Sequence, residues 1–396
     1  MKHILRTYSE LKTTDYLPNL RDFIIERNIN SVSSVQNTGK HSCRLDEFLP
    51  IQVCPFLLHT LIPYIIVLAK GGVFTWMVLE DSNSVVVQCP NPMGAVVCRL
   101  IRKNVDGKIS LFISIESVGG ACPFAHSQGQ NIDIPEYTIY EEHYQIFDTV
   151  FPWVCYGMIT KTHFRLALQM PFTSNDQSGL FYLCHENGIN PDNDSLDVCS
   201  PDRKATVTLR KYEYRCRYHK FPKRDKYDEN MLSTPGLCID LFHAAYPWCL
   251  LKLYESGLEI VEDRNVYIIN CPNPDIEVKL AVSKTPARGA KVWLKVMELL
   301  RMFNKNTEIP FYRISMEVVK GSQKCPRGHF KGQRFEFNLG FRRSMCPASF
   351  DNIYPFMHSV LRGACSIEEM RRRFGGFLIQ CPDAYSKNAY EVSLKG

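Results

Sequence analysis

Cysteine and histidine side chains recur at matching places along the chain, and these residue types hold zinc and iron in proteins. The 396 residues include 16 cysteines and 11 histidines. Most of the cysteines belong to three kinds of motif: a turn that joins a cysteine to a histidine, a cysteine that opens an apolar stretch with an internal proline, and a closing Cys-Pro turn. This equivalent placement predicts a shared role in binding a metal ion or cluster.

The C-terminal part of the chain holds the clearest set of candidate ligands: Cys325, His329, Cys346 and Cys381. Three thiolates and one imidazole satisfy the tetrahedral coordination that zinc prefers. Three thiolates could also hold an iron–sulfur cluster, with a fourth ligand from histidine or elsewhere. We therefore expect zinc or an iron–sulfur cluster as the cofactor.

Three further sets stand at corresponding places: Cys122, His126, His143 and Cys184; Cys216, His219, Cys238 and Cys271; and Cys54 with Cys89. Histidine replaces cysteine at position 143, and this exchange keeps a metal ligand, which favours metal binding. The set at Cys54 lacks a matching first motif, because Cys43 lies only 11 residues before Cys54.

Two other interpretations of these thiols stay open. Free cysteine packs well as a small buried residue, and the spacings are longer than in compact Cys-x-x-Cys zinc motifs. Redox or nucleophilic thiol chemistry is the third interpretation. Five cysteines lie outside the equivalent positions and are interpreted as packing residues: Cys98, Cys155, Cys199, Cys249 and Cys365. His59 and His243 share a position five residues after a cysteine, and we interpret them as core or capping residues.

The elements that would position these residues are clearest near the C-terminus. Alternating apolar and polar residues predict strands at 312–319 and 334–337, and Cys346-Pro347 opens a helix that Pro355 interrupts. Strands are predicted again at 374–380 and 390–395. This unit therefore reads strand, strand, helix, strand, strand.

The same order is expected four times, because the motif spacings agree between stretches of the chain. From the second to the third motif there are 35, 35 and 33 residues in three of them, and 41 in the stretch with His143, which we interpret as an insertion. The predicted fold is α+β, with four tandem units packed into one compact body. The expected ranges are 1–107 with an N-terminal helical segment at 8–27, 108–203 ending in a loop at 190–204, 204–284, and 285–396 with a linker helix at 285–306.

The motifs resemble a family of small stand-alone proteins of about one unit, found mainly in anaerobic bacteria and archaea. The match rests on Cys325, Pro326, Gly328, His329, Cys346, Pro347, Phe350, Tyr354, Pro355, Gly363, Cys381, Pro382 and Asp383, and on Gly71, Gly72, Trp76 and the closing turn Cys89-Pro90-Asn91-Pro92. The resemblance implies four diverged tandem copies of a module with three cysteine motifs. It implies no particular activity.

Composition restricts the class of protein. Hydrophobic residues make up 45% of the chain and charged residues 22%, as in folded globular proteins, and the net charge of +6 does not by itself argue for nucleic acid. The first residues lack the apolar core of a signal peptide, so we expect a reducing cytoplasm. The apolar stretch 54–69 is too short to span a membrane and contains His59 and Pro63, which predicts a buried helix.

These observations lead to one functional hypothesis and two alternatives. The hypothesis is a cytoplasmic, non-catalytic metal- or cluster-binding repeat protein that acts as a scaffold or accessory subunit for a protein partner. The first alternative is an enzyme that uses a retained Cys/His site for redox or thiol chemistry. The second is a structural interaction protein without metal. The sequence indicates no membrane insertion and no nucleic-acid partner.

Overall fold

The structure is a computed structural model of the chain. It describes residues 19–28, 40–49, 51, 53–74, 83–91, 94–105, 108–120, 122, 124–172, 180–186, 205–211, 226–228, 239–254, 267–272, 278–286, 312–320, 332, 334–337, 347–361, 377–382, 384 and 389–394. The expected loop at 190–204 and, apart from the end of β12 at its start, the expected linker helix at 285–306 lie outside these residues.

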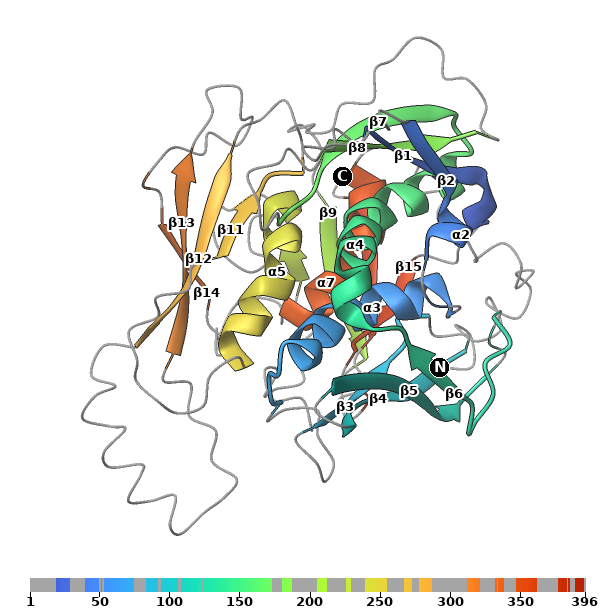
Figure 1. Cartoon of the computed structure of the whole chain (residues 1–396). Helices are drawn as coiled ribbons and strands as arrows, with labels where there is room; N and C mark the ends of the chain where they lie inside the picture. Colours follow the sequence, from blue (N-terminus) through green and yellow to red (C-terminus); the bar gives the residue numbers. More distant parts are fainter. Residues whose placement is uncertain are drawn as a thin grey trace, which may run out of the picture.

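Four long helices lie in the middle of the molecule (Figure 1): α3 (Pro55–Ala69), α4 (Tyr137–Thr160), α5 (Ile239–Tyr254) and α7 (Pro347–Leu361). Each has a proline inside it, and α3 and α7 begin with a proline at the first helical position. Residues Pro55 to Leu68 of α3 are all buried, so the apolar stretch is a core helix, as the sequence predicts. No helix among the described residues is long and apolar enough to cross a membrane.

The strands form four antiparallel sheets of four strands each. One sheet has the order β2 (Lys40–Arg44), β1 (Phe23–Asn28), β8 (Leu180–His185), β7 (Phe164–Gln169). The second has the order β3 (Ser84–Gln88), β4 (Val96–Val105), β5 (Lys108–Val118), β6 (Asn131–Ile134). The third has the order β11 (Tyr267–Asn270), β12 (Lys279–Pro286), β13 (Tyr312–Lys320), β14 (Arg334–Phe337), and the fourth β10 (Lys226–Asp228), β9 (Ala205–Lys211), β16 (Ala389–Leu394), β15 (Phe377–Gln380).

The sheets follow one rule of assembly, which concerns the strands before and after each helix. The two strands before α3 pair with the two strands after α4, and the two strands after α3 pair with the two before α4. The strands around α5 and α7 are exchanged in the same way. Each helix therefore contributes strands to two sheets, and each sheet belongs to two helices.

The observed elements agree with the expected α+β class and with the strands and helix expected near the C-terminus. The helical segment expected at 8–27 is wrong over its last residues, because Phe23–Asn28 is strand β1. Phe23 and Ile25 are buried, and β1 is held between β2 and β8 by long-range pairing that no local pattern encodes. A short 3₁₀ turn (Leu20–Asp22) precedes β1, and the short helix α2 (Leu45–Phe48) follows β2.

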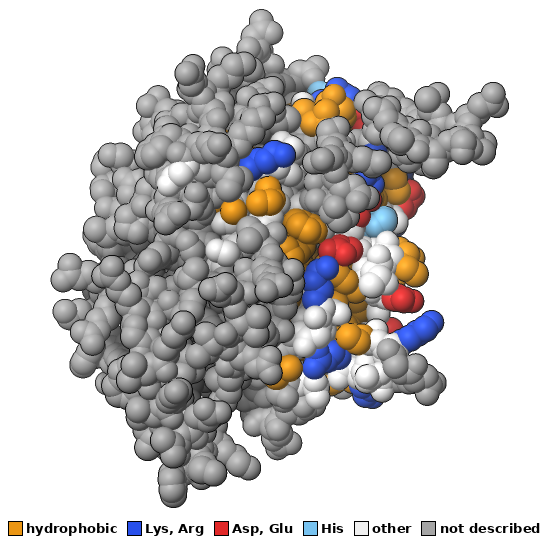
Figure 2. Space-filling model, turned by 60° about the vertical axis from the view of Figure 1, so that its left-hand side comes forward, with side chains coloured by type: hydrophobic (Ala, Val, Ile, Leu, Met, Phe, Trp, Pro, Cys, Tyr) orange, Lys and Arg blue, Asp and Glu red, His pale blue; other side chains and the backbone are white. Residues whose placement is uncertain are grey.

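The core lies where the helices meet the inner faces of the sheets. Strands β5 and β7 alternate between buried and more exposed side chains, as sheets packed on one face do. On the face drawn in Figure 2, the basic and acidic side chains of the described residues are interspersed with apolar and polar ones. This mixed pattern is typical of an ordinary solvated protein surface.

Candidate metal centre

One position is polar in each of the four central helices, four residues before its internal proline. The side chains at this position are His59 in α3, Asp148 in α4, His243 in α5 and Asp351 in α7. All four are buried in the core. Polar and ionisable groups are rarely buried without partners, so an alternation of histidine and aspartate at one core position points to a built site.

The prolines add a backbone oxygen at each of these positions. Proline has no N–H, so it cannot donate to the carbonyl four residues earlier, which here belongs to the polar residue itself. In α4, Pro152 leaves the carbonyl of Asp148 available, and this oxygen lies 3.4 Å from Nε2 of His243 in the neighbouring helix. Pro152 thus leaves a backbone oxygen that faces the centre.

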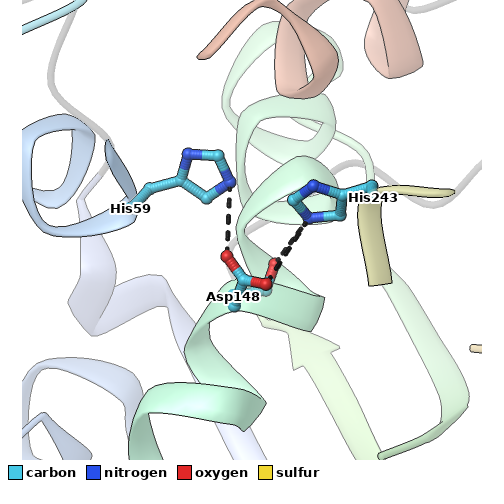
Figure 3. A group of neighbouring side chains, drawn as sticks. All are labelled: His59, Asp148 and His243. Carbon is cyan, nitrogen blue, oxygen red and sulfur yellow. Dashed lines mark hydrogen bonds and ion pairs between the residues drawn. The ribbon is translucent and has the colours of Figure 1, made fainter. Parts of the chain in front are cut away.

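Three of the four side chains converge, as Figure 3 shows, with Asp148 lying between the two imidazoles. His59 Nε2 is 3.6 Å from Asp148 Oδ1, and His243 Nε2 is 3.9 Å from Asp148 Oδ2. One ligand atom from each residue lies within 4.8 Å of the others. Two nitrogens and a carboxylate from three helices therefore surround a common point.

Two of these atoms lack a hydrogen-bond partner. His59 Nε2 and Asp148 Oδ1 are both buried, and neither forms a hydrogen bond with any described residue. An unpaired buried polar atom costs roughly 1–3 kcal/mol, so native proteins rarely keep two facing each other. A bound cation between them would account for both atoms.

Asp351 orients one of the imidazoles. His243 Nδ1 donates to Asp351 Oδ1 at 3.0 Å, which directs Nε2 of the same ring toward Asp148. Metal-binding histidines usually donate their second ring N–H to a carboxylate in this way, which fixes the ring and its tautomer. The His243 ring also stacks on Tyr354, with ring centroids 4.2 Å apart, and the His59 ring stacks on Phe151 at 4.8 Å.

The charge state of the centre follows from burial. Burial, with the charge of His243, lowers the pKa of His59 well below its usual value, so this imidazole is neutral and offers a lone pair. Burial raises the pKa of Asp148 to about 7 and raises that of Asp351. Burial alone would lower the pKa of His243, but the two carboxyl groups outweigh it and raise the pKa to about 9. Without metal, the imidazolium of His243 is the cation that balances the carboxylates.

The donor set fits a divalent transition metal. Zinc binds imidazole nitrogen and carboxylate oxygen at about 2.0–2.2 Å, which places neighbouring ligand atoms roughly 3.4 Å apart in a tetrahedron. The separations of 3.6 Å to Oδ1 and 3.9 Å to Oδ2 of Asp148 are longer than that edge, so the three side chains would draw closer together around an ion. His59, Asp148 and His243 could hold the ion while Asp351 supports His243.

Four of the expected cysteine and histidine ligands, from different sets, lie in one region, but no three of them bring their ligand atoms within 4.8 Å of one another. Cys54 and Cys89 interact through their thiols, Cys122 lies near Cys89, and the backbone N–H of Cys54 donates to His126 Nε2 at 3.3 Å. Cys54 stands at the N-cap of α3 and Cys89 follows β3, whereas Cys122 and His126 lie between β5 and β6.

His143 and Cys184 have other surroundings, so the set Cys122, His126, His143 and Cys184 is not assembled as one group. His143 lies inside α4, which begins at Tyr137, and its ring stacks on Phe48. It is therefore not at a helix start, as the alignment with Cys54 would require. Cys184 lies within β8, beside Glu26 and Arg165.

Backbone hydrogen bonds show which residue of this region matches the closing Cys-Pro turns. Gln88 N and Gln380 N donate to the carbonyls of Pro382 and Pro90, and Gln169 N and Asn270 N donate to those of Pro272 and Pro171. The residue that matches Cys89, Cys271 and Cys381 is therefore Met170, not Cys184. The spacing of 41 residues was thus not an insertion before the closing motif.

The remaining expected ligands are partly outside the described residues. Cys271 and Cys381 are buried at the ends of β11 and β15, and Ser349 Oγ lies 3.2 Å from the sulfur of Cys381. Six expected ligands lie outside the described part of the chain: Cys216, His219, Cys238, Cys325, His329 and Cys346. Among the cysteines interpreted as packing residues, Cys98, Cys155 and Cys249 are buried, while Cys199 and Cys365 are not described.

The shared position of His59 and His243 is visible in the sequence, but none of the four residues at this position is among the expected ligands. Both histidines are core residues, as expected, and they also face the centre. Aligning the four stretches on their prolines would have shown His, Asp, His, Asp in register. That alternation was the available signal for Asp148 and Asp351.

Comparisons of the chain with protein-family models, with curated proteins and with solved structures gave no match. The interpretation of this centre therefore rests on its own residues and their geometry.

Proposed function

We propose that this protein is a non-catalytic metal-binding scaffold in which one buried divalent ion joins three central helices through His59, Asp148 and His243. The observation that carries this proposal is the pair of buried, unpartnered atoms, His59 Nε2 and Asp148 Oδ1, facing each other at 3.6 Å. Zinc is the ion we expect, because two imidazoles and one carboxylate are among its usual ligands.

Burial of the ligands favours a structural role over a catalytic one. The same three ligand types hold iron(II) in oxygenases, but such sites keep positions open for substrate and oxygen. Here the three ligand residues are at most 3% exposed. A closed site of this kind holds elements together, which is what a scaffold or accessory subunit for a protein partner requires.

The interpretation of the chain as four diverged tandem modules in one compact body belongs to the same proposal. It is supported by the recurrence of two strands, a proline-containing helix and two strands around α3, α4, α5 and α7. It is also supported by the matched polar position in those helices. Under this proposal, the modules with histidine at this position supply the nitrogen ligands of a shared centre, and the modules with aspartate supply the carboxylates.

The test is the metal content of the full-length protein, purified anaerobically without chelator. Asp148→Asn keeps the size of the side chain but removes the anionic ligand, so bound zinc should fall by one equivalent. His59→Ala should have the same effect, because it removes a nitrogen ligand.

His185→Ala is the matched control. His185 is also buried, but its Nδ1 donates to the carbonyl of Thr162 at 2.6 Å, away from the centre. This variant should keep its full metal content. Unchanged zinc in folded Asp148→Asn protein would contradict the proposal and favour a metal-free His–Asp network.

A further inference from the structure

A second hydrogen bond joins helices α5 and α7 beside the one between His243 and Asp351. The hydroxyl of Tyr354 donates to Asp240 Oδ1 at 2.5 Å. Asp240 lies three residues before His243 in α5, and Tyr354 lies three residues after Asp351 in α7, so both members of each pair lie on one face of their helix. The ring of Tyr354 also stacks on that of His243, with centroids 4.2 Å apart. We call these four residues the α5–α7 group.

Helices α3 and α4 repeat this arrangement with other residues at the two outer positions. The histidine and the aspartate are His59 and Asp148, and the outer residues, three before the histidine and three after the aspartate, are Phe56 and Phe151. Phe151 stacks on His59 at 4.8 Å and contacts Phe56 edge to face at 5.4 Å. This α3–α4 group therefore has two apolar rings where the α5–α7 group has a carboxylate and a tyrosine.

The two outer residues differ together between the groups. A buried tyrosine hydroxyl usually has a hydrogen-bond partner, and Tyr354 is only 3% exposed. Phenylalanine in place of either Asp240 or Tyr354 would remove one partner of their hydrogen bond, and the α3–α4 group has phenylalanine at both positions. This paired difference indicates that the carboxylate and the hydroxyl act as a unit.

The polar outer pair accompanies the histidine whose ring is held by a hydrogen bond. His243 Nδ1 donates to Asp351 at 3.0 Å. By contrast, His59 Nε2 lies 3.6 Å from Asp148 Oδ1 and has no hydrogen-bond partner among the described residues. Tyr354 packs against one face of the His243 ring, and its hydroxyl is bound to α5. The hydrogen bond of the tyrosine thus holds its ring in place against the imidazole.

We propose that Asp240 and Tyr354 are positioning residues of the His–Asp centre, which keep the imidazole of His243 directed at Asp148 before an ion binds. This inference rests on the proposed function, because it concerns the same ion. The α5–α7 group supplies a nitrogen that is already in place, so the ion has to order only the α3–α4 side of the centre. Ligand groups that are ordered in advance bind more tightly, because less conformational freedom is lost on binding.

The ring N–H of His243 tests this positioning without any metal. In metal-free, full-length protein with ¹⁵N-labelled histidine, the Nδ1–H that donates to Asp351 should give a ring resonance that exchanges slowly with water. His243→Gln identifies this resonance by its loss. Tyr354→Phe keeps the stacked ring and removes only the hydroxyl, and it should raise the exchange rate about tenfold or more, because the imidazole opens more often.

The zinc equivalent that Asp148→Asn loses provides the second measurement. Tyr354→Phe and Asp240→Ala should each lower its affinity about tenfold in competition with a chelator, the lower end of the effect of residues that support a metal-binding histidine. The double variant should bind zinc no more weakly than either single variant, because both changes remove the same hydrogen bond. Asp240→Asn keeps an acceptor for the hydroxyl and should retain most of the affinity.

Tyr390→Phe is the matched control. Tyr390 is fully buried and also donates through its hydroxyl, to Ser349 Oγ at 3.1 Å, outside the centre. This variant should change neither the exchange rate nor the zinc affinity. Asp240→Phe combined with Tyr354→Phe reproduces the outer pair of the α3–α4 group, so it should fold and still bind zinc about tenfold more weakly.

Three results would overturn the inference: an unchanged exchange rate in Tyr354→Phe, an unchanged zinc affinity in this folded variant, or losses that add in the double variant. Wild-type protein that binds no zinc would contradict the proposed function instead. In that case the exchange rate alone decides whether Asp240 and Tyr354 position His243.

Discussion

At the scale of single residues, the central feature is the division of labour among four buried side chains. His59 supplies a neutral nitrogen, Asp148 a carboxylate that lies between two imidazoles, and His243 a nitrogen whose direction is set by Asp351. Replacing any one of them would change either the charge or the orientation of a group at the centre. Substitutions at the four positions should therefore affect metal binding in different ways, as well as to different extents.

Asp351→Asn tests the supporting role of the carboxylate. Asparagine can still accept the hydrogen bond from His243 Nδ1, but it no longer carries the charge that makes this imidazole a better ligand. We expect zinc affinity to fall about 10–100-fold, as it does when a carboxylate partner of a metal-binding histidine is changed. Competition with a chelator of known affinity measures the change, and a loss of the whole equivalent would instead identify Asp351 as a direct ligand.

The titration of His243 should be visible in the stability of the metal-free protein. Its raised pKa of about 9 means that the folded state holds the proton more tightly than the unfolded state, whose value is near 6.5. This contribution is complete below pH 6.5 and is lost as the pH rises through 9. We expect the free energy of unfolding in urea, with chelator present, to fall by on the order of 1–3 kcal/mol across this range. The His243→Gln variant should show a flatter profile, and an equally steep one would refute the assignment.

At the scale of elements, the central helices were predictable, but the buried polar residues that meet between them were predictable only in part. The pair Cys346-Pro347 predicts the start of α7, and the sequence also shows the proline inside each helix. The pairing of strands was not, because alternation shows which face of a strand is buried but not which strand lies beside it. Cys184 illustrates the consequence: it was assigned to the closing motif with an insertion to explain its longer spacing, whereas backbone pairing gives that place to Met170.

Helix α4 contains a glycine whose lack of a side chain determines how it packs on a sheet. A Cβ at Gly157 would lie 3.0 Å from the ring of Phe23 in β1 and 3.1 Å from the ring of Phe164 in β7. Alanine normally stabilises a helix interior relative to glycine by about 1 kcal/mol. Here we expect Gly157→Ala to destabilise the protein by roughly 1–3 kcal/mol, because the rings must move.

Urea denaturation measures this effect, and a second substitution provides its control. Phe23→Leu opens space beside the new methyl group, so the double variant should recover part of the stability lost by Gly157→Ala relative to Phe23→Leu alone. Additive losses in the double variant would show that the close approach to Phe23 is not the cause.

At the scale of the whole molecule, the proposed central ion joins the two halves in which strands are exchanged. His59 and Asp148 belong to the pair α3 and α4, and His243 belongs to the pair α5 and α7. Reciprocal backbone hydrogen bonds at Gln88 with Gln380 and at Gln169 with Asn270 join the same halves at their periphery. A bound ion would therefore add a third connection between the halves, in their interior.

Zinc should stabilise the folded chain by mass action, because the unfolded chain cannot assemble ligands from three helices. At free zinc 1,000 times above the dissociation constant, an occupied site contributes about 4 kcal/mol to the free energy of unfolding. Chemical denaturation with and without zinc should show this gain. The Asp148→Asn variant should lack the gain in stability that comes from zinc at the His–Asp centre. An identical gain in this variant would show that the stabilising ion binds elsewhere.

The exchange of strand pairs also bears on the minimum size of such an architecture. A polypeptide with only one of these helices and its four flanking strands would carry two half-sheets, each with an unpaired edge. Open edges invite pairing with another molecule, and a two-fold symmetric dimer would close both at once. Joining two such molecules head to tail by gene fusion would convert that dimer into a single polypeptide, and a second doubling would leave one interior to be shared by four segments that are free to diverge.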